Sequence, residues 1–198
     1  MNIKRKSTLY LCRGALIAAL YTLLTWIAIS MGIGNGFLQF RFSEAMCVLP
    51  IFMPEAVGGL YVGCLLANLL TGNIVDVLFG SLATLVGAVG TYLLRRQKRW
   101  IALIPPVLAN AVIIPLVLTF GYHMEQAFPL MMLSVGAGEL LSVYALGLPL
   151  CSLLKKRMPG LVTESQKNTT KKFLKKSKKS IDKSGQVWYN NQALAMAE

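Results

Sequence analysis

Long runs of apolar residues, separated by short polar stretches, make up most of the first 154 residues of the chain. A run of about 20 apolar residues can cross the hydrocarbon of a bilayer as an α-helix, because its backbone polar groups then bond within the helix. The pattern therefore predicts an all-α, six-helix transmembrane bundle. The expected helices are Tyr10–Met31, Ala45–Met53, Ala56–Leu70, Val77–Leu94, Trp100–Phe120 and Phe128–Leu154.

The second of these helices is too short to cross a membrane alone. As an α-helix, Ser43–Pro54 would reach about 18 Å, against about 30 Å of hydrocarbon. It is either a re-entrant piece or a short crossing that neighbouring helices shield from lipid.

The distribution of basic residues favours the short crossing. Cytoplasmic loops of membrane proteins collect Lys and Arg, and basic clusters occur at Lys4–Lys6, at Arg95–Arg99 and at Lys155–Arg157. All three clusters can face the cytoplasm only if the chain crosses an even number of times before residue 95. We therefore expect six crossings in the cell membrane, with both termini cytoplasmic.

Composition and charge support a membrane domain followed by a basic tail. The chain is 55% hydrophobic and 14% charged, whereas soluble domains are about 25% charged. Of its 20 Lys and Arg residues, 11 lie in residues 155–198, so the net charge of +12 does not indicate nucleic-acid binding. We expect a basic N-terminus at 1–9, the membrane domain at 10–154, and a disordered cytoplasmic tail at 155–198 that contacts membrane lipid.

Small residues and prolines predict how the helices pack. Gly59, Gly63 and Ala67 repeat every four residues, as do Ala83, Gly87 and Thr91, and such small faces allow close helix approach in lipid. Prolines remove backbone donors, so they should kink or locally open the last two helices. These prolines are Pro105, Pro106, Pro115 and Pro149.

Several polar residues fall at positions where a membrane helix would otherwise be apolar. In the expected topology they share one layer, the outer half of the membrane, although they are far apart in sequence. They are Gln39, Arg41, Glu44, Asn68, Asp76, Asn110 and Glu139. Charged groups there are costly, so we interpret the layer as an outward-facing solute site. The alternatives are helix capping by Asp76, a simple Arg41–Glu44 ion pair, and helix bridging by Asn68 and Asn110.

Enzyme chemistry finds little support in the sequence. His123 has no partner at ligand spacing and the four cysteines are scattered in apolar surroundings, so neither a metal nor another cofactor is expected. No Gly-rich phosphate loop with its lysine occurs, so any ATP hydrolysis must come from other subunits. Two other classes remain open: a glutamate-dependent intramembrane protease using Glu44, Glu55 or Glu139, and a scaffold that recruits partners through its tail.

Six short motifs in residues 10–155 together resemble the QueT family, the substrate-binding (S) components of energy-coupling factor (ECF) transporters associated with queuosine precursors. These motifs are Gln39–Ala45, Leu49–Ala56, Gly63–Asn68, Asp76–Thr84, Pro106–Asn110 and Gly136–Leu140. The resemblance implies partnership with a membrane coupling subunit and two ATP-binding subunits. It also implies that a small face on the first helix, here Ala15 and Ala19, docks the coupling subunit.

For a deazaguanine base as solute, the polar layer allows a specific hypothesis. Glu139 would accept the adjacent N–H and amino groups of the base, while Asn68 and Asn110 would bind its oxygen and ring nitrogens. A cationic aminomethyl group would favour Asp76 or Glu44, with Arg41 holding Glu44 in place. Another purine-like or vitamin solute is the alternative within the same class.

Overall fold

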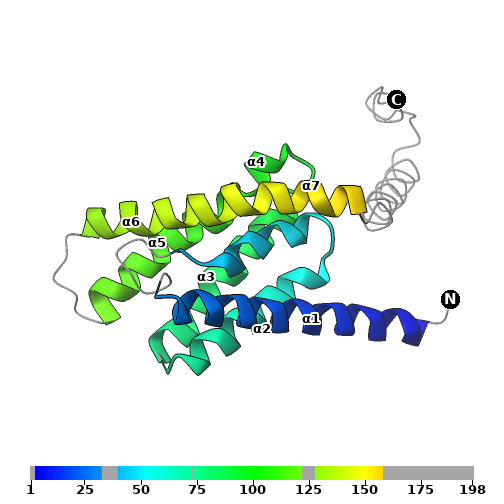
Figure 1. Ribbon diagram of the computed structural model, residues 1–198, viewed down its shortest axis with the longest axis horizontal. Helices are drawn as coiled ribbons and strands as arrows, with labels where there is room; N and C mark the ends of the chain where they lie inside the picture. The colour runs from blue at the N-terminus through cyan, green and yellow to red at the C-terminus, as the bar shows by residue number, and fades with distance from the viewer. Residues whose placement is uncertain (1–2, 33–39, 73, 122–127, 158–198) are drawn as a thin grey trace, which may run out of the picture. The chain divides into compact units, whose positions relative to one another are not determined.

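The computed structural model describes residues 3–32, 40–72, 74–121 and 128–157, within the unit Met1–Pro159. In this part of the chain every regular element is helical (Figure 1), which confirms the all-α prediction. The elements are α1 (Ile3–Ser30), η1 (Phe42–Ile51), α2 (Glu55–Leu70), α3 (Ile74–Leu93), α4 (Arg99–Ala102), α5 (Ile104–Gly121), α6 (Phe128–Leu140), η2 (Leu141–Leu146) and α7 (Gly147–Arg157).

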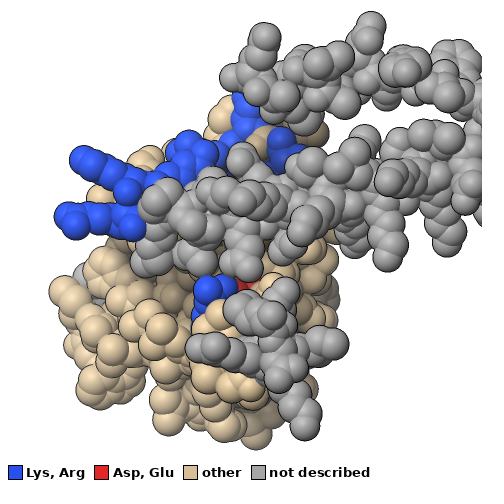
Figure 2. All heavy atoms as spheres, turned by 90° about the vertical axis from the view of Figure 1, so that its right-hand side faces the viewer, with Lys and Arg blue, Asp and Glu red and all other residues tan. Residues whose placement is uncertain are grey.

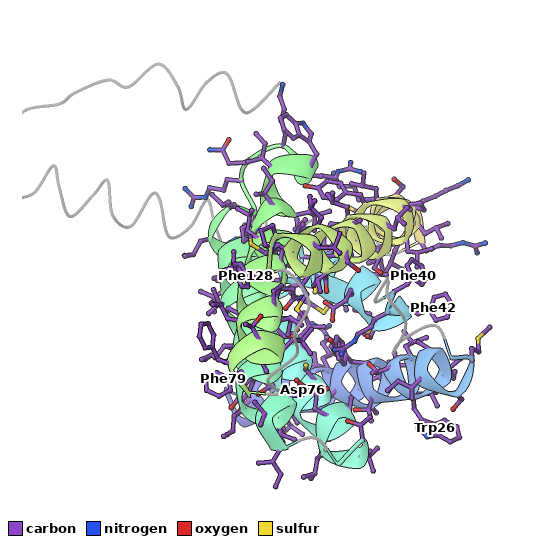
Figure 3. All side chains as sticks on the ribbon, turned by 90° about the vertical axis from the view of Figure 1, so that its left-hand side faces the viewer. Trp26, Phe40, Phe42, Asp76, Phe79 and Phe128 are labelled. Carbon is purple, nitrogen blue, oxygen red and sulfur yellow. The ribbon has the colours of Figure 1, made fainter. Side chains whose placement is uncertain are left out.

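Four of the described helical stretches are long and apolar enough to cross a membrane. They are Ser7–Ser30, Ile74–Leu93, Arg99–Phe120 and Phe128–Arg157. Large apolar side chains point away from the bundle, including Trp26 and Phe79 (Figure 3). Side chains of this kind are stable outside a bundle when lipid surrounds it, so the fold is that of a multi-pass membrane protein.

Successive helical stretches run in alternating directions, so that α1 begins and α7 ends at the same end of the bundle (Figure 1). Arg13 and Glu55 join two elements there: Nη1 of Arg13 lies 3.3 Å from Oε1 of Glu55, which pairs α1 with the first turn of α2. The α3–α4 connection, with Arg95–Arg99, also lies toward this end.

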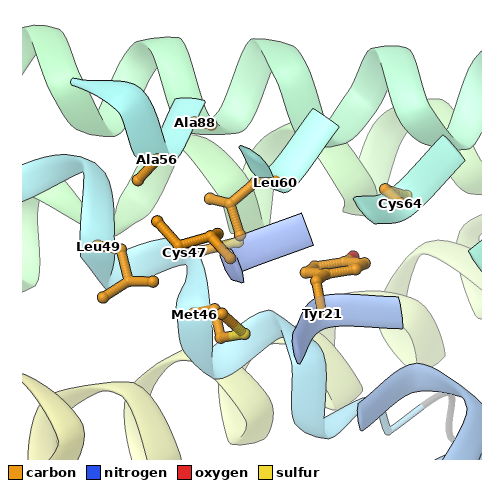
Figure 4. Close-up of a cluster of buried hydrophobic side chains, with 9 residues drawn as sticks. Tyr21, Met46, Cys47, Leu49, Ala56, Leu60, Cys64 and Ala88 are labelled. Carbon is orange, nitrogen blue, oxygen red and sulfur yellow. The ribbon is translucent and has the colours of Figure 1, made fainter. Parts of the chain in front are cut away.

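The short second segment is a 3-10 helix enclosed by other helices. All residues from Ser43 to Pro50 are buried, and η1 contacts α1, α2, α3, η2 and α7. A 3-10 helix rises about 2.0 Å per residue, so ten residues extend about 20 Å, more than an α-helix of that length would. Neighbouring helices therefore enclose this segment, as the shielded alternative requires. Met46, Cys47 and Leu49 pack in the central apolar core (Figure 4).

Glycines bring neighbouring helices into backbone contact, as the small-residue repeats predict. A Cβ at Gly63 would lie 2.8 Å from the Ala18 carbonyl oxygen, and one at Gly59 would lie 2.7 Å from that of Gly14. On the other side of the bundle, a Cβ at Gly87 would lie 2.6 Å from Cα of Pro106. The α1–α2 and α3–α5 contacts therefore depend on the missing side chains.

Prolines coincide with the irregular points of the last two long helices. The expected helix Trp100–Phe120 is interrupted at Leu103, and α5 then starts with Pro105 and Pro106 in its first turn, where no backbone donor is required. In the last helix the π-helical stretch η2 directly precedes the turn that contains Pro149. A proline there leaves an upstream carbonyl without its usual donor, which fits the predicted local opening.

Replacement of Gly63 by alanine should destabilise the α1–α2 contact. The new methyl group would meet backbone atoms of α1, which cannot rotate away, and overpacking of this kind costs about 1–3 kcal/mol. Thermal unfolding of the detergent-solubilised protein, followed by circular dichroism, measures the change. Gly58→Ala is the matched control, since a Cβ there meets nothing within 4 Å; equal melting temperatures for the two variants would contradict the packing argument.

Candidate functional site

Glu44 lies at the centre of a buried polar cluster. Its side chain is 1% exposed, so the carboxyl group lies inside the bundle. The Tyr21 hydroxyl of α1 donates a hydrogen bond to Oε1, and the Cys47 thiol donates to Oε2 at 3.1 Å. Both carboxyl oxygens of Glu44 therefore have partners from the protein.

Glu139, on α6, differs from Glu44 because one of its oxygens has no partner. The Asn110 amide donates to Oε1 at 2.9 Å, whereas Oε2 is buried and accepts no hydrogen bond from the part of the chain that the structure describes. A buried acceptor without a donor costs free energy of about 1–3 kcal/mol. Oε2 of Glu139 is thus the atom of the cluster best placed to accept a hydrogen bond from a bound molecule.

Arg41 links the two acids electrostatically. Its guanidinium interacts with the charges of both Glu44 and Glu139, and its backbone N–H donates to the Ser142 hydroxyl at 3.2 Å. The alternative of a simple Arg41–Glu44 ion pair is not observed, because no contact between these two described side chains falls within 4 Å, and Tyr21 and Cys47 hold Glu44 instead.

Asn68 connects α2 to the beginning of α3. Its amide donates to the backbone carbonyl of Asp76 at 2.8 Å and to the Cys64 sulfur at 3.5 Å. Gly80 makes room for this amide, because a Cβ there would lie 3.0 Å from Nδ2. Cys64 also accepts a hydrogen bond from Thr84 at 3.2 Å. Asn68 thus bridges helices, which was one of its two predicted roles.

The predicted site residues therefore divide into three groups. Asn110 and Glu139 are hydrogen-bonded to each other, and Arg41 and Glu44 interact electrostatically with Glu139. These four residues come from three separate parts of the chain. Asp76 lies in the first turn of α3 and is half-buried (Figure 3); its backbone carbonyl joins the network through Asn68. Gln39 lies outside the described residues.

The sequence analysis missed the contribution of α1 to this cluster. Tyr21 and Thr25 are fully buried, and the Thr25 hydroxyl donates to that of Ser43 at 2.8 Å. The available signal was their spacing, since two polar residues four apart lie on one face of a helix. Cys47 and Cys64 were expected only to lie in apolar surroundings, yet both take part in the hydrogen-bond network.

A shallow apolar groove lies elsewhere, between α1 and α2, with a volume of about 400 Å³. Ala19 and Trp26 are among its lining residues. Ala15 and Ala19 are exposed, whereas Gly14 and Ala18, one step around the helix, lie against α2. The first helix therefore presents two small-residue faces, of which only one is used within the bundle.

The part of the chain that the structure describes offers no site for a metal ion. In residues 3–32, 40–72, 74–121 and 128–157, no three His, Cys, Asp or Glu side chains group together as a metal site would require. His123 lies outside these ranges.

Comparison with known families identifies the fold. The family model described as QueT transporter matches residues 11–156, which include every described residue of the polar cluster. The chain belongs to the QueT transporter family. This confirms the resemblance drawn from the six motifs.

One similar protein is the queuosine precursor transporter QueT of Lactococcus lactis subsp. cremoris (strain MG1363). It is 34% identical to this chain over 84 residues, a stretch that covers 42% of this chain and 50% of the relative. The chain thus aligns with about half the length of this relative. No solved structure matches the chain.

Removal of the Tyr21 hydroxyl should destabilise this member of the QueT family. Tyr21→Phe keeps the packing but leaves Oε1 of buried Glu44 without its donor, which costs about 1.5–3 kcal/mol. A lower melting temperature in detergent is the expected result. Tyr61→Phe on α2 is the control, because Tyr61 is not part of the network; if both variants melted like the unmodified protein, the Tyr21–Glu44 bond would contribute nothing to stability.

Proposed function

We propose that the chain is the substrate-binding component of an ECF-type importer and that it captures a queuosine precursor through its deazaguanine base. Membership in the QueT transporter family and similarity to the queuosine precursor transporter of Lactococcus lactis support the transport role. The observation that carries the site assignment is the buried oxygen Oε2 of Glu139, which has no donor among the described residues.

The base of such a precursor offers the donors that Glu139 lacks. A guanine-like edge presents a ring N–H and an exocyclic amino group side by side, and one carboxylate can accept from both. Asn110 fixes the orientation of this carboxylate by binding Oε1, and Oε1 retains a second lone pair. A pre-oriented acceptor binds more tightly because less side-chain freedom is lost on binding.

The charges around the cluster favour a solute with cationic character. Glu44 and Glu139 supply two carboxyl groups, while Arg41 supplies one guanidinium. An aminomethyl substituent on the base would therefore find an acid close to its binding position, with Glu44 nearer to the centre of the cluster than Asp76. A neutral purine-like solute would use Glu139 but would gain nothing from Glu44.

For the topology, we propose six crossings with both termini in the cytoplasm. The end where α1 begins and α7 ends also carries Arg95–Arg99, and the positive-inside rule assigns this end to the cytoplasm. Two of the crossings are short: η1 extends about 20 Å, and the 16 residues of α2 extend about 24 Å. Both short helices can lie within the membrane because neighbouring helices cover them or bond their backbone polar groups.

For the partners, we propose that the exposed Ala15–Ala19 face docks a membrane coupling subunit, which in turn works with two ATP-binding subunits. Small residues allow a partner helix to approach closely without a large loss of side-chain entropy. Gly14 and Ala18 already contact α2, so Ala15 and Ala19 remain free to contact a second protein.

Replacement of Glu139 by glutamine should weaken solute binding at least tenfold, because one strong acceptor becomes a donor that faces the donors of the base. Equilibrium binding of labelled 7-aminomethyl-7-deazaguanine to the purified protein measures this loss. Glu55→Gln is the matched control, since Glu55 pairs with Arg13 away from the cluster.

Three outcomes of that experiment are informative. Undiminished binding by Glu139→Gln would remove Glu139 from the site. Equal loss in both variants would point to a fold defect rather than to a lost contact. Displacement of the label by an unrelated purine with equal affinity would favour the broader alternative of a general purine-like solute.

Larger side chains on the exposed face of α1 should prevent assembly with the coupling subunit and leave solute binding unchanged. Ala15→Leu combined with Ala19→Leu should abolish co-purification with the coupling subunit, while the affinity for the solute stays unchanged. Ala145→Leu is the control, because Ala145 is also exposed but lies on η2. A double variant that still co-purifies with its partner would rule out this docking face.

A further inference from the structure

Basic side chains gather at the end of the bundle where α1 begins and α7 ends. They come from two separate stretches, the α3–α4 connection with the start of α4, and the last turn of α7. Figure 2 views this end and shows Lys and Arg side chains gathered in its upper part, while a separate basic area lies lower down beside a small acidic area. The seven residues are Arg95, Arg96, Lys98, Arg99, Lys155, Lys156 and Arg157.

One specific contact brings the stretches together. The Tyr144 hydroxyl of η2 donates to the carbonyl of Trp100, the residue that follows Arg99, at 2.6 Å. Lys155 follows Cys151 by four residues and therefore lies on the same face of the helix. The contact between Tyr144 and Trp100 places the start of α4 beside this last helix, and Arg99 and Lys155 both act electrostatically on the buried Cys151 thiol, so the two cations lie in the same region.

This pair of cations has no described counter-charge. Arg95 is occupied, since it donates to the Tyr92 carbonyl at 3.0 Å and lies 3.9 Å from the centre of the Tyr92 ring. In contrast, no described carboxylate forms an ion pair with Arg99 or Lys155, and the pair that does form joins Arg13 to Glu55. Two neighbouring like charges repel each other, and an anion held between them removes this cost.

The surface next to these cations is apolar. Trp100 is 53% exposed and Leu153 is 57% exposed, and Leu153 lies one turn below Arg157 on the same face of α7. Tryptophan is enriched at the level of lipid headgroups. A ligand that fits both parts has an anionic head and an apolar tail.

We propose that the phosphate group of an anionic phospholipid binds between α4 and the end of α7, held by Arg99 and Lys155, with its acyl chain along the apolar surface below. Basic pockets between membrane helices on the cytoplasmic side are suited to such headgroups. The helix dipole alone explains Lys155 in the last turn of α7, but not Arg99, which begins its helix. This site is independent of the solute cluster at Glu139.

The test uses the full chain, purified in a neutral detergent, with phosphatidylglycerol or phosphatidylcholine added. Native mass spectrometry counts bound lipid, and the melting temperature is recorded in parallel. The unmodified protein should retain phosphatidylglycerol in preference to phosphatidylcholine. Arg99→Gln combined with Lys155→Gln should bind phosphatidylglycerol at least tenfold more weakly. Lys155→Gln alone should lose part of the preference, and it changes only an exposed side chain.

The matched control is Lys171→Gln combined with Lys172→Gln, which removes the same charge from the tail. It should keep the lipid preference, and loss of the preference in this control instead would place the lipid on the tail and overturn the proposal. So would an unchanged preference in Lys155→Gln and in the double variant. Full displacement of lipid by millimolar inorganic phosphate would also overturn it, because the ligand would then be a free anion.

Discussion

The hydrogen bond between the Tyr21 hydroxyl and buried Glu44 is the interaction on which the rest of the arrangement depends. It ties η1, a ten-residue 3-10 helix, to the middle of α1, and Cys47 completes the coordination of the carboxyl group from within η1 itself. An acid in this position is stable only when both oxygens have donors. With Glu44 satisfied, η1 can occupy the centre of the bundle, and its preceding residue Arg41 is carried to the vicinity of Glu139.

The two buried acids, Glu44 and Glu139, thus differ in how many of their carboxyl oxygens are hydrogen-bonded. Glu44 is saturated by the protein and acts as part of the framework, whereas Glu139 has one oxygen fixed by Asn110 and one without a described donor. This contrast agrees with the proposal that Glu139 accepts hydrogen bonds from the base, while Glu44 orders the site and contributes its charge toward a cationic substituent. The close glycine contacts of α1 with α2 and of α3 with α5 hold the helices that bear these residues at fixed separations.

Most of the helices could be predicted from the sequence, because apolar runs and proline positions report directly on lipid exposure and on backbone donors. Glycine repeats likewise predicted which helix faces meet. Side-chain partners could not be predicted in the same way: Arg41 and Glu44 are three residues apart, yet the carboxyl group bonds Tyr21, 23 residues away in the chain. Which side chains pair depends on how helices that are distant in the sequence align with one another, and no local sequence pattern determines this alignment. The 3-10 form of η1 was also inaccessible, since its composition does not separate it from an α-helix.

The π-helical stretch Leu141–Leu146 gives the last long helix a property that an unbroken α-helix lacks. A π turn holds an extra residue, and one residue corresponds to about 100° of rotation in an α-helix. The stretch therefore sets the rotation of α7 relative to α6, so that both Glu139 on α6 and Cys151 on α7 are buried. Tightening this one turn to α geometry would rotate one end of the helix relative to the other, so a single turn determines which side chains of α7 face the bundle.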